Sequence, residues 1–338
     1  MTPIGRHALH GGDCLAVLPT LPAASVDLVV TSPPYNLDIA YATYRDSREA
    51  GEYVVWIASV ATALARVLRP GGSVFLNLAG SGRAPWLPFE VALALRETFV
   101  LQNHIAWIKS VALGGDGVGH FKPIPGQRFL HQAHEPLFHF TLRGDVRLDR
   151  LAIGVPFKDK SNIARRGHAR DLRCRGDTWF IPYATVQSRA RRHGHPATFP
   201  VELPLWCAFL HGVADPVVLD PFMGTGTTLV AAERAGGRGL GIELDPAYLA
   251  AATARVAEAA ATTQHLRLDD TELAALLQPG ARGGAGTLLL NLADRVNKTT
   301  HALALDAHDI AAIRRHAAGP EGARLEAAFA RHLQQRVS

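Results

Sequence analysis

The chain has few cysteines and no cluster of metal-ligating residues, and these absences exclude several classes of protein. Its 338 residues contain three cysteines, Cys14, Cys174 and Cys207, and none of them forms a Cys-x-x-Cys pair. A disulfide framework and a zinc knuckle are therefore unsupported. Cys174, His193 and His195 lack the spacing of metal ligands, so we expect no metal site.

Long hydrophobic runs are also missing. Hydrophobic residues make up 48% of the chain, but they come in runs of four to eight. About 20 consecutive apolar residues are needed to cross a bilayer, so we expect no membrane segment. The first residues, Met-Thr-Pro-Ile-Gly-Arg, contain no apolar core of a signal peptide, which predicts a soluble protein of the cytoplasm.

Positive charge is concentrated in one segment. Residues 143–195 contain 13 Lys or Arg and 5 Asp or Glu, a net charge of +8, whereas the whole chain carries +5 and its remainder is therefore at −3. Each phosphate that such a segment neutralises releases a condensed counterion, so a basic patch suits a polyphosphate partner. A solvated basic loop is the alternative.

Short apolar runs alternate with helical patterns on both sides of this basic segment. The expected strands are residues 26–31, 73–78, 104–109, 135–141, 216–220 and 239–243. The expected helices are residues 52–68, 203–211 and 227–235, followed by 306–316 and 321–332 in a region rich in Ala, Leu, His and Arg. The alternation predicts one α/β domain with a mostly parallel, twisted sheet flanked by helices, interrupted in its middle and followed by a helical extension.

A glycine turn links an expected strand to an expected helix at residues 217–228, Val-Val-Leu-Asp-Pro-Phe-Met-Gly-Thr-Gly-Thr-Thr. Glycines let a ligand approach the backbone, the helix N-terminus offers N–H groups to an anion, and Thr227 and Thr228 add hydroxyls. Glu243 ends the next strand, where nucleotide sites keep an acid for ribose hydroxyls. An adenosine-containing ligand is expected, and a purely structural turn is the alternative. Leu229 replaces the third glycine of the dinucleotide fingerprint, which disfavours a nicotinamide or flavin.

A second motif, Thr-Ser-Pro-Pro-Tyr-Asn at residues 31–36, follows an expected strand, where parallel sheets place their active sites. Pro33 and Pro34 have no N–H, and residues before proline are extended, so the stretch presents carbonyls and almost no donors. With the Ser32 hydroxyl, it can accept both hydrogens of an NH₂ group. Tyr35 offers an aromatic face for a planar base. We therefore expect a pocket for a nucleobase amine, with a proline turn over a packed tyrosine as the alternative.

The two motifs resemble those of the DNA amino-methyltransferases, which carry an S/D/N-P-P-Y/F/W catalytic motif and a D-P-F-x-G-x-G-T-T cofactor motif. The catalytic motif comes first, which resembles the circularly permuted order of the β-group. The resemblance covers about residues 8–260. It also includes Gly-Asp-Cys at 12–14, Trp-Ile-Lys at 107–109, His-Glu at 134–135 and His-Pro-Ala-Thr-Phe-Pro at 195–200.

The resemblance implies a Rossmann-like methyltransferase fold in three parts. These are the catalytic half (1–142), a basic target-recognition region (143–194) and the cofactor-binding half (195–261). It leaves the expected helical C-terminal extension (262–338) unexplained. It also implies S-adenosylmethionine as the cofactor, with S-adenosylhomocysteine as the product, and a base that is rotated out of duplex DNA before direct attack on the methyl group.

The resemblance assigns roles to residues of three kinds. The catalytic residues are Ser32, Pro33, Pro34 and Tyr35. The cofactor-binding residues are Asp13 and Phe222 near the adenine, Glu243 on the ribose, and Thr198, Asp220, Gly224, Thr225, Gly226, Thr227 and Thr228 toward the methionine end. The candidates for DNA contacts are Arg165, Arg166, Arg170, Arg173, Arg175, Arg189, Arg191 and Arg192.

Serine at the first catalytic position is typical of cytosine-N4 members of this family, whereas adenine-N6 members usually carry Asp or Asn. We therefore expect Ser32 to serve cytosine, with adenine as the alternative. A nucleotide-binding oxidoreductase would leave Ser-Pro-Pro-Tyr unexplained, and a non-catalytic DNA-binding protein would not need the catalytic residues that are all present. Double-stranded DNA is the expected partner and the nucleoid the expected location, while a homodimer and a cognate restriction endonuclease stay open.

Overall fold

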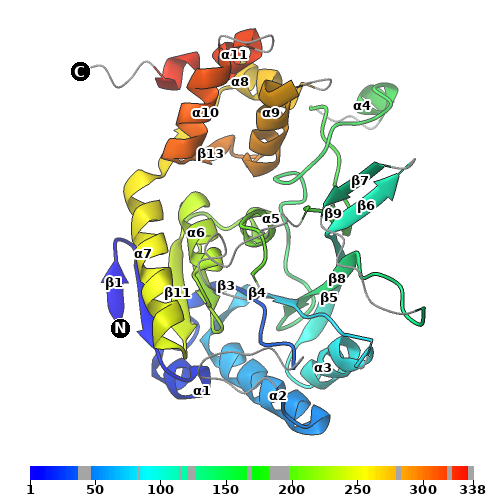
Figure 1. The fold of residues 1–338 in the computed structure, drawn as a ribbon, viewed down its shortest axis with the longest axis vertical. Helices are drawn as coiled ribbons and strands as arrows, with labels where there is room; N and C mark the ends of the chain where they lie inside the picture. The colour runs from blue at the N-terminus through cyan, green and yellow to red at the C-terminus, as the bar shows by residue number, and fades with distance from the viewer. Residues whose placement is uncertain are drawn as a thin grey trace.

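A computed structural model describes residues 1–36, 47–82, 84–113, 116–119, 127–165, 170–182, 198–278, 283–317 and 322–333. Within these ranges, nine strands form one sheet (Figure 1). In sheet order they are β1 (Thr2–Ile4), β2 (His7–Gly11), β11 (Arg238–Glu243), β10 (Val217–Asp220), β3 (Val26–Thr31), β4 (Leu68–Asn77), β8 (His134–Thr141), β5 (Val100–Ile108) and β9 (Thr178–Phe180). A separate hairpin is formed by β6 (Ser110–Leu113) and β7 (Asp116–Gly119).

The centre of the sheet is parallel, as the sequence predicts. Neighbours from β2 through β11, β10 and β3 to β4 are all parallel, whereas β8 is antiparallel to both β4 and β5. β10 and β3 are neighbours in the sheet, and the chain leaves them in opposite directions. From β10 it passes through α6 (Thr227–Arg234) to β11, and from β3 it passes through α2 (Ala50–Val67) to β4. The β10–β3 pair is therefore a topological switch point, and α/β sheets bind their ligands at the carboxyl ends of such strands.

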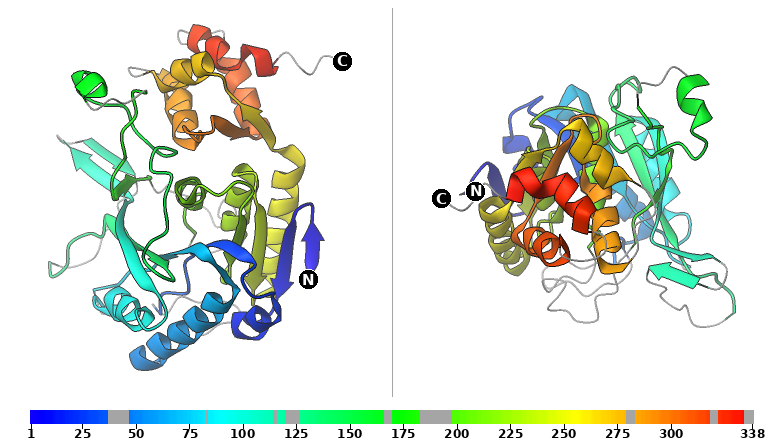
Figure 2. Two further views of the ribbon diagram at one scale, coloured as in Figure 1. Left: turned by 180° about the vertical axis from the view of Figure 1, so that it is seen from behind. Right: turned by 90° about the horizontal axis from the view of Figure 1, so that it is seen from above.

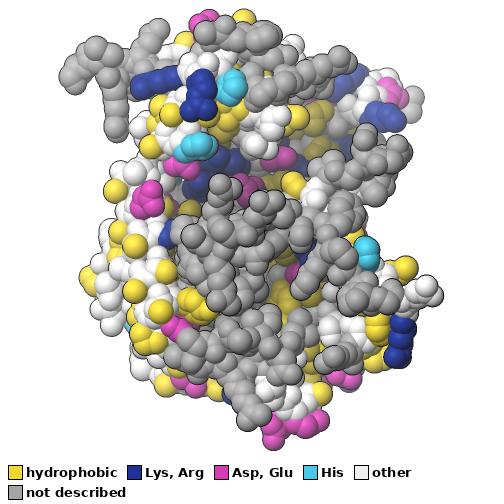
Figure 3. Space-filling view, viewed as in Figure 1, with side chains coloured by type: hydrophobic (Ala, Val, Ile, Leu, Met, Phe, Trp, Pro, Cys, Tyr) yellow, Lys and Arg dark blue, Asp and Glu magenta, His cyan; other side chains and the backbone are white. Residues whose placement is uncertain are grey.

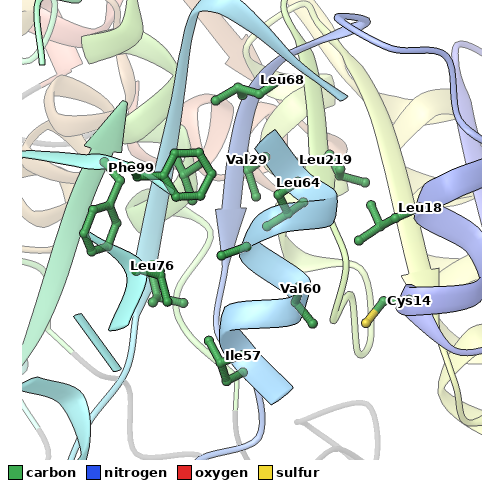
Figure 4. Close-up of a cluster of buried hydrophobic side chains, with 14 of the residues drawn as sticks. Cys14, Leu18, Val29, Ile57, Val60, Leu64, Leu68, Leu76, Phe99 and Leu219 are labelled. Carbon is green, nitrogen blue, oxygen red and sulfur yellow. The ribbon is translucent and has the colours of Figure 1, made fainter. Parts of the chain in front are cut away.

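Helices cover both faces of the sheet. α2 and α3 (Leu87–Leu95) pack with one buried cluster, and α5 (Glu202–His211) packs with another. Val29 of β3 belongs to the first cluster and Val30 to the second, because successive side chains of a strand point to opposite faces. Figure 4 shows Val60 and Leu64 of α2 in the first cluster, together with Val29 and Leu219 from the strands.

Among the described helices, α2 alone is long and apolar enough to cross a membrane by length and composition. Its fully buried residues recur every three or four positions, which places them on one face of the helix. They are Tyr53, Ile57, Val60, Ala61, Leu64 and Val67. This face belongs to the core cluster against the sheet, so packing in a folded domain accounts for the apolar composition.

β4 begins earlier than the sequence predicts. Val26 pairs with Leu68 and Leu28 with Ser73, so residues 69–72, Arg-Pro-Gly-Gly, form an irregularity within the strand rather than a turn before it. The buried Asp27 carboxylate holds this irregularity in place. It accepts hydrogen bonds from Arg69 and, at 2.9 Å, from the Val217 N–H.

The C-terminal unit, residues 264–333, has a buried core of its own. It contains α8 (Asp270–Leu277), α9 (Gly283–Arg295), α10 (Ala307–Ala317) and α11 (Gly322–Leu333). The expectation of a purely helical extension was incomplete, because β12 (Gln264–Arg267) and β13 (Ala302–Leu305) pair antiparallel. Strands of four residues are too short to show a clear period in the sequence. Figures 1 and 2 show α7 (Pro246–Thr262) running beside β1 and leading to this unit.

Candidate active site

The two predicted motifs lie side by side at the carboxyl ends of β3 and β10. Thr31 Oγ1 donates to Asp220 Oδ1 at 2.7 Å. Asp220 also accepts from the Phe222 N–H at 3.0 Å and from Thr228 Oγ1 at 2.6 Å. Asp220 is 2% exposed, and this burial raises its pKa to about 6 in spite of the three hydrogen bonds. One buried carboxylate therefore joins the residue before Ser32 to the glycine turn.

The glycine turn requires its glycines. Gly226 has φ +81°, and a Cβ at this position would lie 3.1 Å from Val256 Cγ2, so an L side chain is disfavoured by both conformation and space. Gly224 also has a positive φ, +54°, and its N–H donates to Glu243 Oε2 at 2.7 Å. Gly226 caps α6 without a side-chain hydrogen bond, which leaves the helix N-terminus for a ligand.

Glu243 ends β11 with its carboxylate fixed in place. Its Oε1 accepts from the Asp245 N–H at 2.8 Å, while its Oε2 is held by the turn. Burial raises the pKa of Glu243 to about 7. The Glu243 carbonyl accepts from the Gly12 N–H at 2.9 Å, so the next residue, the exposed Asp13, lies beside the same strand end. Asp13 caps α1 (Cys14–Val17), which the short 3-10 helix η1 (Leu18–Thr20) follows. Residues from the N-terminal segment and from the segment after the basic region therefore meet here.

The threonines of the turn are almost fully buried. The Thr228 hydroxyl donates to Asp220, and the Thr227 hydroxyl accepts from Arg255 Nη1 at 2.8 Å. Arg255 also donates to the Thr225 carbonyl at 3.2 Å. These side chains shape the turn from inside the protein. Arg255 was not predictable from the sequence, because no motif marks it and only the packing of α7 against α6 brings it to the turn.

Two further predicted cofactor residues are half-buried. Phe222 makes an edge contact with the Trp56 ring of α2, with 5.4 Å between ring centroids. Thr198 lies four residues before α5. No three His, Cys, Asp or Glu side chains gather at a possible metal position in the part of the chain that the structure describes.

Three polar side chains surround the Tyr35 hydroxyl. Tyr35 Oη lies 2.8 Å from Asn77 Oδ1, 3.1 Å from Glu135 Oε2 and 2.9 Å from Ser32 Oγ. Asn77 Nδ2 donates to the Pro136 carbonyl at 3.2 Å, which turns its Oδ1 toward Tyr35. Because Asn77 and Glu135 present only acceptors, Tyr35 donates to one of them and the Ser32 hydroxyl donates to Tyr35. The Ser32 lone pairs are therefore left to accept hydrogen bonds.

An ion pair supports this arrangement from the neighbouring strands. Lys109 Nζ lies 2.6 Å from Glu135 Oε1. Burial, and then the negative charge of Glu135, hold the pKa of Tyr35 well above its ordinary value, so the hydroxyl keeps its proton. The Pro34 carbonyl accepts from the Tyr53 hydroxyl of α2 at 2.7 Å, which anchors the loop to the core. Lys109 and Glu135 lie in the segments Trp-Ile-Lys and His-Glu of the sequence, but no role for either is predictable from the sequence.

The arginines predicted to contact DNA fall into separate groups. Arg166, Arg189, Arg191 and Arg192, together with the side chain of Arg165 at the end of α4 (Ser161–Arg165), lie outside the described residues. Arg173 is exposed, and Arg170 donates to a carbonyl of the C-terminal unit at 3.3 Å. Arg175 needs a correction. It pairs with Asp294 of α9 at 2.8 Å, lies 4.0 Å above the Trp206 ring of α5 and has a side chain only 15% exposed, so it packs the C-terminal unit onto α5.

Comparisons with known proteins agree with this geometry. A family model described as DNA methylase, of the N6 and N4 type, matches residues 26–254. The type II methyltransferase M.ScaI of Streptomyces caespitosus is 28% identical over 262 residues, 73% of this chain and 80% of its own. M.BglII of Bacillus subtilis is 26% identical over 259 residues, 71% of this chain and 66% of its own.

Solved structures share the fold. The PvuII DNA methyltransferase superposes with a TM-score of 0.57 at 21% identity, over 76% of this chain and 92% of its own. TTHA0409 of Thermus thermophilus, described as a DNA modification methylase and solved with S-adenosyl-L-methionine, gives 0.50 at 28% identity, over 75% of this chain and 96% of its own. The family match spans both motifs and most of the sheet, and the chain therefore belongs to the DNA methylase family of the N6 and N4 type.

Proposed function

We propose that this protein transfers a methyl group from S-adenosylmethionine to the exocyclic N4 amine of a cytosine flipped out of a specific sequence in duplex DNA. The orientation of the Ser32 hydroxyl supports the proposal most directly. Its proton is used by Tyr35, so it faces a ligand as an acceptor. An NH₂ group on a planar base is the ligand that needs acceptors there.

The neighbouring residues suit such a base. In this proposal the half-buried Tyr35, held by its hydroxyl, stacks on the base, and the carbonyl of Pro33, the next residue after Ser32, is the second acceptor. Both acceptors draw the nitrogen lone pair out of conjugation with the ring and toward the methyl group. A base paired inside the duplex could not reach them, so it must leave the helix. Alignment of the nitrogen with the methyl carbon then provides much of the acceleration.

The residues at the other strand ends fit S-adenosylmethionine, which supplies an electrophilic methyl group when bound. The Glu243 carboxylate suits the ribose hydroxyls, and the uncapped N-terminus of α6 after Gly226 suits a carboxylate. Phe222 and Asp13 line the side assigned to the adenine. TTHA0409, which shares the fold, was solved with this ligand, which supports the assignment.

The basic surface supports duplex DNA as the partner. Figure 3 shows Lys and Arg side chains on this face gathered over the C-terminal unit and near α4. The exposed Arg173 belongs to the basic segment, and such side chains contribute phosphate contacts that weaken as salt is added. We propose Arg173, and with it Arg165, Arg166, Arg189, Arg191 and Arg192, as the DNA-contacting arginines.

The choice of cytosine rests on Ser32, because a hydroxyl stands where adenine-N6 members of the family usually carry a carboxylate or an amide. Adenine-N6 methylation is the second candidate. The test is to express the protein in a host that lacks DNA methylation, digest the DNA to nucleosides and separate them by mass. We expect N4-methylcytosine. N6-methyladenine would establish the second candidate, and the absence of any methylated nucleoside, with bound S-adenosylmethionine measured by calorimetry, would contradict the proposed function itself.

A further inference from the structure

Methylation of an amine leaves the nitrogen with one proton too many. The nitrogen forms a bond to the methyl carbon as the bond between that carbon and the donor sulfur breaks, with the electron pair staying on sulfur. The nitrogen is then cationic until a proton leaves it. A serine hydroxyl is too weak a base to keep this proton, so Ser32 requires an acceptor behind it.

A carboxylate stands at the end of the hydrogen bonds that begin at Ser32. Ser32 Oγ lies 2.9 Å from Tyr35 Oη, and Tyr35 Oη lies 3.1 Å from Glu135 Oε2. Glu135 is 9% exposed, and its other oxygen is paired with Lys109 at 2.6 Å. The ion pair fixes the Glu135 side chain beside Tyr35, and a carboxylate is a group that can receive a proton.

We propose that Glu135 receives the proton lost by the target amine, through a relay formed by the Ser32 and Tyr35 hydroxyls. The amine proton passes to Ser32 Oγ, the Ser32 proton passes to Tyr35 Oη, and the Tyr35 proton passes to Glu135 Oε2. Both hydroxyls end as they began, and Glu135 becomes neutral. An amine made cationic by methylation is a strong acid, so a carboxylate is a sufficient base. The relay rests on the proposed function.

Asn77 keeps the Tyr35 hydroxyl in position between turnovers. Its Oδ1 lies 2.8 Å from Tyr35 Oη, and Glu135 Oε2 lies at 3.1 Å, so the hydroxyl has two alternative acceptors. Rotation about the bond between the ring and the oxygen redirects the Tyr35 proton to Glu135. Asn77 therefore positions Tyr35 but does not take the proton, because an amide oxygen is a poor base. Lys109 is likewise a positioning residue, acting on Glu135.

Two conservative substitutions interrupt the relay at different points. Tyr35→Phe keeps the ring for stacking and removes the conducting hydroxyl, and Glu135→Gln keeps the shape and removes the base. General base catalysis contributes about 10²–10⁴-fold, so we expect each variant to lower the single-turnover rate on duplex DNA by at least about 100-fold. Because both act on one relay, the double variant should be no slower than the slower single variant. Glu97→Gln, whose side chain is 81% exposed, is the matched control and should keep the wild-type rate.

Readouts other than rate separate the relay from a structural role. S-adenosylmethionine affinity, measured by calorimetry, and flipping, measured by 2-aminopurine fluorescence at the target position, should stay within about twofold of wild type in both variants. The slow rate of Glu135→Ala should rise with added formate but not with chloride at equal ionic strength. A small carboxylate can replace the lost base, but it cannot repair a misfolded site.

The outcomes also separate this inference from the proposed function. Wild-type protein that methylates no DNA contradicts the proposed function. Wild-type protein that methylates DNA, together with a Glu135→Gln variant at full rate, overturns the relay alone, as do losses that add fully in the double variant. Should Glu135→Gln fail to fold, Tyr35→Phe decides, because a full rate in that variant also overturns the relay.

Discussion

Thr31 Oγ1 donates a hydrogen bond of 2.7 Å to Asp220 Oδ1, across two strands whose residues are 189 positions apart in the sequence. This contact joins the residue before the proposed amine acceptor Ser32 to the first residue of the glycine turn. One buried carboxylate therefore links the two segments that we propose to hold the methyl acceptor and the methyl donor.

Asp220→Ala should lower both stability and activity. It leaves the buried hydroxyls of Thr31 and Thr228 without their acceptor, at a cost of about 1–3 kcal/mol for each group left unsatisfied. Asp220→Asn is the matched control, because an amide oxygen can still accept from Thr31 while its NH₂ donates to Thr228. Chemical denaturation and methyl transfer should show a large loss for alanine and a small one for asparagine. Equal losses of stability and activity in the two variants would mean that the negative charge of Asp220 is required, and not only its hydrogen bonds to Thr31 and Thr228.

The raised pKa of Glu243 predicts that cofactor affinity depends on pH. In its proposed role Glu243 accepts from ribose hydroxyls as an ionised carboxylate, so binding should weaken as the pH falls below about 7, by up to about tenfold per pH unit. Calorimetric titrations between pH 5.5 and pH 8 measure this. In Glu243→Gln the affinity should be weak and independent of pH, whereas a slope that persists in this variant would point to another group.

Without ligand, the same pKa affects stability in the opposite direction. The folded state holds the Glu243 proton more tightly than the unfolded state does, because the pKa of this carboxyl is near 4.5 in the unfolded chain. This contribution to the free energy of unfolding is therefore complete below pH 4.5, and it is lost as the pH rises through about 7. Asp220, raised from 3.8 to about 6, acts with the same sign. Denaturation of the ligand-free protein across this range should show stability falling less with pH in Glu243→Gln.

Tyr35→Ala should abolish most methyl transfer while S-adenosylmethionine affinity stays nearly intact. The substitution removes the stacking surface, worth about 1–3 kcal/mol per base, together with the hydroxyl that orients Ser32. Single-turnover rates and calorimetry on the same preparation measure methyl transfer and cofactor binding separately. A parallel loss of cofactor binding would show that Tyr35 supports the fold of both halves of the site.

Gly226→Ala should destabilise the protein and weaken cofactor binding. The left-handed conformation costs a residue with a side chain about 1–2 kcal/mol, and the new methyl group also crowds Val256 of α7. Gly71 is the control, because a Cβ there meets nothing within 4 Å, and Gly71→Ala should change stability by less than about 0.5 kcal/mol. Thermal denaturation with and without S-adenosylmethionine compares the two.

Arg173 and Arg175 should behave differently although only one residue separates them. Arg173→Ala should weaken DNA binding and reduce the slope of log affinity against log salt by about one, because it removes one phosphate contact. Arg175→Ala should instead destabilise the protein by about 1–3 kcal/mol, through loss of the Asp294 and Trp206 contacts. Fluorescence anisotropy at several salt concentrations and thermal denaturation distinguish the two effects. A reduced slope of log affinity against log salt in Arg175→Ala would show that Arg175 contacts DNA.

Local chemistry made much of the fold predictable. The β-branched run at residues 26–31 predicts a strand, and β3 spans Val26–Thr31. The helix expected at 227–235 is α6, Thr227–Arg234, because the glycine turn before it marks where it begins. Short strands that no glycine or proline turn delimits were not predictable, as β12 and β13 show. The partners of buried side chains could not be predicted either, as the contacts of Arg175 with the C-terminal unit illustrate.

The sequence by itself determined the two motifs, their order along the chain and the strand ends that carry them, because glycine, proline and apolar periodicity act over a few residues. Only the tertiary structure decided that Glu135, 100 positions from Tyr35, lies within hydrogen-bond distance of its hydroxyl, and that Lys109 pairs with that carboxylate. These contacts depend on β8 pairing with both β4 and β5, and strand pairing over such separations is set by the packing of the whole core.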